Sequence, residues 1–272
     1  MGSTGRSGLT DRDLVLLGRV TGHSPEELRD RLRRRPWLLH ELVREPAVVE
    51  AVTGPGGDPG DVTSPFLLFV VLVHRAAEEL LDATYVNDWT GPRMRLPVFD
   101  VEPLQEFAED PARLLFVAHL LASFAAPRRL QVPVDALDLE GLVDWVVVAL
   151  PRDRPALMHH LGDLALFLAG VLPDATGPQV LSAPLAERLG RSVDMTADEI
   201  LALIDPGSAS PGLDTLESLG PRWYRAATSE PRVAVPSVVT DVAVRFRPAR
   251  RFLNHLTDRH LYRLDPGWGF AA

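Results

Sequence analysis

Two adjacent histidines and an aspartate interrupt one of the most apolar stretches of the chain, Pro155–Pro173. His159 lies four residues before Asp163 and His160 lies three before it, so either imidazole can meet the carboxylate on one face of a helix. A carboxylate beside an imidazole fixes the imidazole's tautomer, as it does at ligand and metal sites. The alternative is a structural role, in which Asp163 holds a histidine where the helix enters the core.

A second histidine and carboxylate align in the stretch that follows Pro65. His74 and Glu78 are four residues apart, on a segment whose first half is apolar all round and whose second half is charged. A helix surface with ordinary ion pairs explains the same spacing. If the two pairs converge, they would line a ligand site, with an arginine supplying a fixed positive charge for an anionic group. The predicted ligand-binding residues are His74, Glu78, His160, Asp163, Arg93 and Arg222.

Histidine–carboxylate pairs on several helices are also how metal sites are built in helical bundles. His74, Glu78, His160 and Asp163 are therefore weak candidates for metal ligands. The Glu-x-x-His spacing of the di-iron carboxylate bundles is absent, as are the HExxH, GxSxG and GxGxxG motifs. We therefore assign no catalytic residue and no cofactor from the sequence.

Two residue types are missing from the composition. The 272 residues include no cysteine and no lysine, so all 28 basic residues are arginine. The first absence excludes thiol nucleophiles, cysteine-ligated zinc and iron–sulfur clusters. The second excludes a Schiff-base lysine and the lysine of a phosphate-binding loop or a kinase. We attribute the arginine usage to a GC-rich genome, which reduces the weight of arginine-rich runs.

The elements that would position these residues are predicted to be helices. Ser24 with Pro25, and Thr196 with Glu199, are typical helix-start signals. Leucines recur at spacings of three and four over 155–172, which is the period of a helix with one buried stripe. We therefore expect an all-α fold, a compact irregular bundle of at least nine helices with negligible β-structure. The bundle should pack around residues 66–85, 111–125, 139–150 and 155–172.

Clusters of glycine and proline indicate how the chain is divided. Residues 54–64 contain the sequence GPGGDPG and lack the strand and the lysine of a phosphate-binding loop, so we interpret them as a linker. The other predicted parts are a disordered N-terminus at 1–9, a small N-terminal helical subdomain at 10–53, a main helical domain at 65–265 and a flexible tail at 266–272.

The segment between Val86 and Phe99 has no helical period. Its aromatic residues and arginines are predicted to form a short hairpin or a lid. Aromatic and arginine residues together on a long loop are typical of contact surfaces. This segment is therefore a candidate binding surface.

The charge and the apolar runs limit the partners. The formal net charge of −9 disfavours nucleic acid and anionic membranes. Binding of nucleic acid through an arginine-rich final helix, expected over 237–263 with a kink at Pro248, is kept as a minor alternative. The start of the chain lacks the apolar core of a secretory signal, and the longest apolar runs are too short to span a membrane. We therefore expect a soluble, cytoplasmic protein.

These observations favour a non-enzymatic binding or regulatory protein whose partner is another protein or a small ligand. The main alternative is a metal-dependent helical enzyme that uses the histidine–carboxylate pairs. A homodimer is an open alternative, although no heptad seam supports it.

Overall fold

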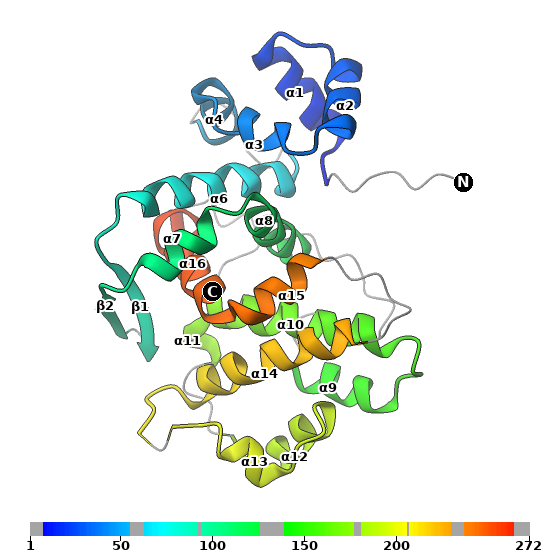
Figure 1. Ribbon diagram of the computed structural model, residues 1–272, viewed down its shortest axis with the longest axis vertical. Coiled ribbons are helices and arrows are strands. Elements are labelled where there is room, and N and C mark those ends of the chain that lie inside the picture. The colour runs from blue at the N-terminus through cyan, green and yellow to red at the C-terminus, as the bar shows by residue number, and fades with distance from the viewer. Residues whose placement is uncertain are drawn as a thin grey trace. The chain divides into compact units, whose positions relative to one another are not determined.

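The computed structural model describes residues 8–54, 63–91, 94–125, 139–176, 181–205, 207–229 and 237–263 (Figure 1). It confirms the all-α fold, with more than the nine helices expected over these ranges. The β-structure of the described residues is one antiparallel hairpin, formed by β1 (Val86–Gly91) and β2 (Met94–Val98). No described helix combines the length and the apolar character needed to cross a lipid bilayer.

Contacts within the chain group it into two compact units. The first comprises Met1–Asp82, Ala108–Ala126 and Arg259–Ala272, and the second comprises Ala83–Phe107 and Pro127–Asp258. Most of the predicted linker at 54–64, and nearly all of the predicted N-terminal and C-terminal tails, lie outside the described residues. The predicted domain boundaries therefore stay a prediction.

The first unit contains short helices and two long ones. They are α1 (Asp11–Thr21), α2 (Pro25–Arg34), α3 (Leu38–Leu42), α4 (Pro46–Thr53), α6 (Pro65–Leu81), α8 (Pro111–Ala125) and the 3-10 helix η1 (Leu261–Arg263). Thr10 and Asp13 form a capping box at the start of α1. The other carboxylate oxygen of the fully buried Asp13 accepts from the backbone N–H of Ser64, 2.8 Å away. One aspartate thus joins the beginnings of α1 and α6.

The long helix α6 supplies much of the core of this unit. Every residue from Phe66 to His74 is buried, as its apolar sequence predicts. Ser64 caps the helix and Pro65 occupies its first position, where a missing N–H is tolerated. The helix ends at Leu81, earlier than expected, because the chain from Val86 onward enters the hairpin.

The second unit contains the hairpin and the remaining helices. These are α7 (Glu102–Ala108), α9 (Leu139–Val148), α10 (Arg154–Val171), α11 (Pro173–Thr176), α12 (Ala183–Ser192), α13 (Ala197–Leu201), α14 (Pro211–Thr228), α15 (Ser237–Val244) and α16 (Phe246–Arg259); the last residues of α7 and α16 belong to the first unit. The capping box of Thr196 and Glu199 begins α13, as predicted.

Glycines allow the central helices of the second unit to approach closely. A Cβ atom on Gly162 of α10 would lie 2.5 Å from the ring of Tyr224 on α14. A Cβ atom on Gly220 of α14 would lie 2.2 Å from the ring of Phe246 on α16. Both distances are shorter than any normal carbon–carbon contact, so these aromatic rings fill the space that a larger residue would occupy.

The final helix is divided at Arg245, which separates α15 from α16. The break falls three residues before Pro248, where a kink was predicted. A proline inside a helix has no N–H to donate, and its ring displaces the carbonyl four residues earlier, here that of Val244. The proline therefore explains why the break lies one turn before it.

Candidate functional site

His74, the first predicted site residue, forms a hydrogen-bonded chain inside the first unit. Its Nδ1 lies 2.7 Å from the carbonyl oxygen of Val70, so Nδ1 carries the proton and donates it. Its Nε2 then accepts from Nδ1–H of His40 on α3, 2.6 Å away. Burial lowers the pKa of His74 to about 4, which keeps its imidazole neutral.

Glu78, one turn further along α6, has a different partner. Its Oε1 lies 2.7 Å from Nε of Arg44, and both side chains are about half exposed. The structure therefore gives His74 and Glu78 separate partners, although they occupy adjacent turns of one helix. An exposed pair of this kind contributes little to stability.

Asp163 lies on α10 in the second unit, where Tyr224 is its main partner. The hydroxyl of Tyr224 donates to Oδ1 of Asp163 at 2.9 Å, and Nε2 of His159 lies 3.8 Å from the same oxygen. Burial raises the pKa of Asp163, while His159 and the tyrosine hydroxyl act in the opposite direction. Burial and the neighbouring carboxylate raise the pKa of Tyr224 well above its usual value. His159 thus makes one of the two predicted histidine–aspartate contacts.

The remaining predicted residues are His160, Arg222 and Arg93. His160 is half-buried on α10, and Arg222 on α14 donates to the carbonyl oxygen of Ser218 at 2.8 Å. Arg93 lies outside the described residues. His74 and Glu78 belong to the first unit and His160 and Asp163 to the second, so a pocket lined by all four stays a prediction.

A metal site has no support in the described part of the chain. Within it, no group of three or more histidine, aspartate or glutamate side chains is arranged to hold a metal ion. The histidine–carboxylate contact at His159 and Asp163 supplies two groups, which is fewer than a zinc ion takes from a protein.

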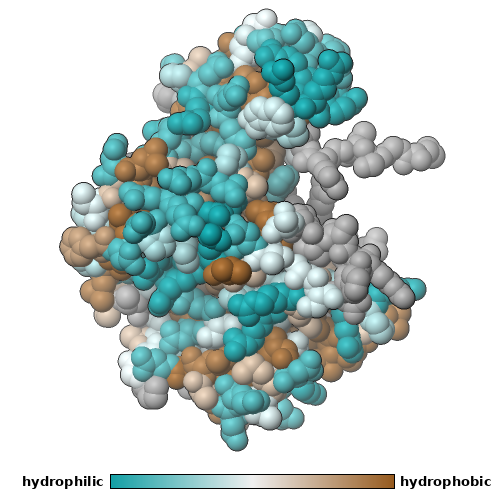
Figure 2. All heavy atoms as spheres, viewed as in Figure 1, coloured by the Kyte–Doolittle hydropathy of each residue, from teal (hydrophilic) through white to brown (hydrophobic). Residues whose placement is uncertain are grey.

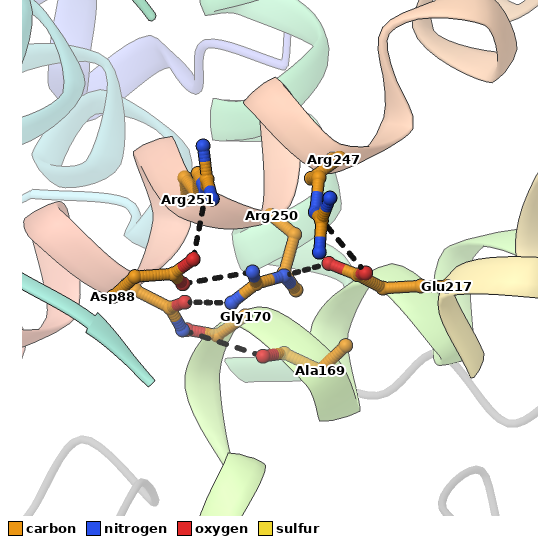
Figure 3. Close-up of polar contacts among 8 residues, drawn as sticks. Asp88, Ala169, Gly170, Glu217, Arg247, Arg250 and Arg251 are labelled. Atoms are coloured by element: carbon orange, nitrogen blue, oxygen red, sulfur yellow. Dashed lines mark hydrogen bonds and ion pairs between the residues drawn. The ribbon is translucent and has the colours of Figure 1, made fainter. Parts of the chain in front are cut away.

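A buried ionic network in the second unit brings together charged residues from three elements (Figure 3). Arg250 of α16 is at its centre, with only 2% of its side chain exposed. Its Nη2 lies 2.8 Å from Oδ1 of Asp88 on β1, and its Nε donates to Oε1 of Glu217 on α14. Its Nη1 donates to Oδ1 of Asn254 at 2.6 Å. All three guanidinium nitrogens are therefore occupied.

Asn254 connects this network to α10. Its Nδ2 donates to the carbonyl oxygen of Gly170 at 2.7 Å, with a longer contact of 3.3 Å to that of Ala169. These carbonyls lie in the last turn of α10, where no further helical N–H can satisfy them. The buried amide of Asn254 thus joins α16 to α10, because it accepts from Arg250 and donates to the end of α10.

Two further arginines of α16 extend the network. Nε of Arg251 donates to Oδ2 of Asp88 at 2.8 Å, and Nε of Arg247 lies 3.4 Å from Oε2 of Glu217. Figure 3 shows Arg247 and Arg251 on either side of Arg250. Each carboxylate is thus shared between Arg250 and one of its neighbours.

The network attaches the hairpin to α16, and a second ion pair reinforces the attachment. Nη2 of Arg95 on β2 lies 2.7 Å from Oδ1 of Asp258. The same guanidinium lies 4.1 Å above the ring centroid of Trp89, which is 3% exposed. Trp89 of β1 and Arg95 of β2 are opposite one another in the strand register. Asp88 joins β1 to α16, and Arg95 joins β2 to the same helix.

Burying these charges has an energetic cost. Taking a carboxylate and a guanidinium out of water costs several kcal/mol for each ion, and only good geometry with further hydrogen bonds recovers it. An apolar core of the same volume is often as stable or more so. The network is therefore better explained by what it positions, namely the hairpin, than by its contribution to stability.

Four large apolar side chains on the anchored hairpin and its flanks are exposed. Tyr85, Met94, Leu96 and Phe99 are 53%, 49%, 52% and 72% exposed. The rings of Tyr85 and Phe99 lie 6.0 Å apart, and Met94 and Leu96 are two residues apart on β2. Figure 2 shows apolar residues gathered at the edge where Figure 1 places β1 and β2. We call these four residues the apolar hairpin surface.

Residues 86–99 were predicted to form a short hairpin or a lid, and the structure shows the hairpin; the ionic network was not predicted. The arginines of the final helix were attributed to genome composition. A signal was nevertheless present, because Arg250 and Asn254 recur with Phe246, Leu253 and other apolar residues on the buried face of α16. Polar residues at apolar-periodic positions indicate a buried polar network.

Comparisons with known proteins add no function to this surface. No protein-family model matches the chain, and neither a curated protein nor a solved structure matches it. The geometry itself defines an all-α protein in which a buried ionic network anchors an apolar hairpin.

Proposed function

We propose that the chain is a non-enzymatic binding protein that docks a protein partner on the apolar hairpin surface. The observation that carries this proposal is the reversed polarity of the hairpin. The carboxylate of Asp88 is buried, whereas the large apolar side chains of β2 and its flanks are exposed. Tyr85 lies beside Phe99, and Met94 and Leu96 share one face of β2; neighbouring exposed apolar side chains such as these are typical of an interaction site, unlike single scattered ones.

The exposure of β2 favours a protein over a small ligand. A small molecule is usually bound in a concavity that encloses most of its surface. The side chains of β2 instead stand in solvent along nearly the whole strand. Pro97 removes one backbone donor from this strand, so we expect a partner to contact the side chains rather than to add a strand.

The rigidity of the hairpin supports the same function. An ordered loop that must immobilise on binding loses affinity through conformational entropy, and a pre-ordered one avoids that loss. Here Asp88 and Arg95 tie the two strands to α16 before any partner arrives. The buried charges thus support a surface that is ready to bind.

A displayed peptide library tests the proposal. Peptides should be selected on the full chain and then measured against the double variant Leu96→Ser/Phe99→Ser. A matched control is Val148→Ser/Val244→Ser, which removes two valines of the same unit that are 75% and 71% exposed. Both variants change surface residues, so each should alter the unfolding free energy by less than about 1 kcal/mol.

We expect selected peptides to bind the wild type and the valine control equally and to lose at least about tenfold in affinity for the hairpin variant. Equal binding to all three proteins, or a selection that yields no peptide above background, would contradict the proposal.

A further inference from the structure

The charges of the ionic network do not balance. It contains three guanidinium groups, from Arg247, Arg250 and Arg251, and two carboxylates, from Asp88 and Glu217. One positive charge is therefore left over, in a chain whose formal net charge is −9. Arg251 is only 16% exposed, so an added anion gains more beside it than beside an exposed arginine.

Two of these arginines reach the surface: the side chain of Arg247 is 65% exposed and in water, whereas that of Arg251 is mostly buried. Nε of Arg251 is occupied by Asp88, and its side chain is 16% exposed. Its terminal nitrogens have no bond to any described residue, and they are not among the buried polar atoms that lack a partner. Figure 3 shows one of them pointing away from Asp88. The structure thus presents a guanidinium fork whose stem is fixed and whose outer donors are available.

We propose that Arg251 binds a carboxylate of the partner segment that docks on the apolar hairpin surface. This inference rests on the proposed function and adds a charged anchor to it. A carboxylate accepts two parallel N–H bonds from a guanidinium, and its single negative charge matches the single excess charge of the network. A phosphate, with close to two charges, would leave the site negative.

The position of Arg251 indicates which part of the apolar hairpin surface the partner's carboxylate would lie beside. Arg251 bonds to Asp88, which is opposite Leu96 in the strand register. A carboxylate on Arg251 therefore lies near the middle of the hairpin rather than at its end. Asp100 and Glu102 are exposed just after β2, so they disfavour an acidic residue beside Phe99. The partner segment should carry Asp or Glu beside the apolar residue that packs on Leu96.

The experiment uses the same displayed library and adds two variants of the full chain. Arg251→Gln removes the charge and the fork, while Asp88 keeps its ion pair with Arg250. Arg188→Gln is the matched control, because Arg188 is also a partly exposed arginine paired with carboxylates in the second unit. Thermal unfolding of each variant shows whether it is folded before binding is measured.

We expect hairpin-dependent peptides to be enriched in Asp or Glu at one position. For one such peptide, replacing that residue with Asn or Gln should weaken binding to the wild type about tenfold and leave binding to Arg251→Gln unchanged. The Arg188→Gln protein should behave as the wild type. If Arg251→Gln does not fold, Arg251→Lys replaces it; a lysine keeps the charge but lacks the fork, so part of the tenfold effect should be lost.

Two other results are distinguishable. Hairpin-dependent peptides with no acidic preference, or an acidic preference that survives in Arg251→Gln, would overturn this inference and leave the proposed function standing. Peptides that ignore Leu96 and Phe99, or no peptides at all, would overturn the proposed function and this inference with it.

Discussion

The two units of the chain bury polar side chains in opposite ways. In the second unit, Arg250 keeps its charge and is 1% exposed, and carboxylates from two other elements surround it. In the first unit, His74 is 5% exposed and neutral, and it is hydrogen-bonded to His40 and to a backbone carbonyl. At these two positions, the second unit supplies counter-charges to a buried ion, and the first unit keeps a buried side chain neutral.

The difference has consequences for how each arrangement fails. A guanidinium cannot lose its proton in a protein, so Arg250 needs Asp88 and Glu217 at all pH values. An imidazole can stay neutral when burial lowers its pKa, so His74 needs only a donor and an acceptor. The ionic network should therefore be disrupted by removal of one of its partners, and the histidine pair by protonation of His74.

The largest effect is expected for Arg250→Ala. Its removal leaves Asp88 and Glu217 with 6% and 16% exposed side chains and without their central cation. Leaving a buried charge without its partner costs about 3–5 kcal/mol, so the unfolding free energy should fall by that amount. Urea unfolding of the full chain at neutral pH measures it.

The triple variant Arg250→Leu/Asp88→Leu/Glu217→Leu is the control for this prediction. It removes Arg250 together with both buried carboxylates and leaves only the less buried Arg247 and Arg251, so it should be more stable than Arg250→Ala alone. If the single variant unfolds at the same urea concentration as the wild type, the network has no role in holding the hairpin.

Acid should weaken the first unit through His74. The pKa of His74 falls from 6.5 in the unfolded chain to about 4 in the folded one, so between these values the unfolded chain binds more protons. Stability should be complete above pH 6.5 and decrease as the pH falls toward 4. At about 1.4 kcal/mol for each unit of pKa shift, the loss is about 3 kcal/mol. The pKa of His40 is lowered as well, which acts in the same direction.

Arg44 increases the effect, since its charge lowers the pKa of both histidines. The comparison variant is His74→Leu, which cannot be protonated and keeps an apolar contact on α6. Its urea midpoint should change less between pH 7 and pH 4.5 than that of the wild type. Parallel pH profiles for the two proteins would show that other groups cause the acid sensitivity.

Arg250→Lys separates charge from geometry within the network. An ammonium group keeps the positive charge but cannot reach Asp88, Glu217 and Asn254 through three separate nitrogens. We expect a loss of about 1–3 kcal/mol, between the wild type and Arg250→Ala. A lysine variant as stable as the wild type would mean that the charge alone is sufficient.

Features of the fold that depend on residues close together in the sequence could be predicted from the sequence alone. The helix starts at Ser24 and Thr196 were predictable, because a cap is formed by residues three positions apart. The hairpin between Val86 and Phe99 was predictable from the loss of helical period. The final helix was predicted as one helix with a kink at Pro248. The structure shows a break between α15 and α16 that lies within one turn of this proline.

The partners of Asp88, Arg250 and His74 were not predictable in the same way. His74 was aligned with Glu78 because helix geometry places residues four apart on one face. Its partner, His40, comes from another helix 34 residues away. Arg250 likewise meets Glu217, 33 residues away, and the more distant Asp88. Contacts between elements depend on the tertiary packing, which a single sequence does not reveal through spacing.

The smallest effect is expected for Arg188→Ala, which tests whether burial or the number of partners gives Arg250 its importance. Arg188 of α12 also meets two carboxylates, with contacts of 2.6 Å to Asp144 and 2.8 Å to Glu140. Both carboxylate side chains are 55% exposed, so water replaces the lost arginine. The unfolding free energy should fall by about 1 kcal/mol or less, and the difference should shrink further in 1 M salt. If the unfolding free energy falls as much as in Arg250→Ala, then two carboxylate partners alone make an arginine important for stability, and burial does not add to the effect.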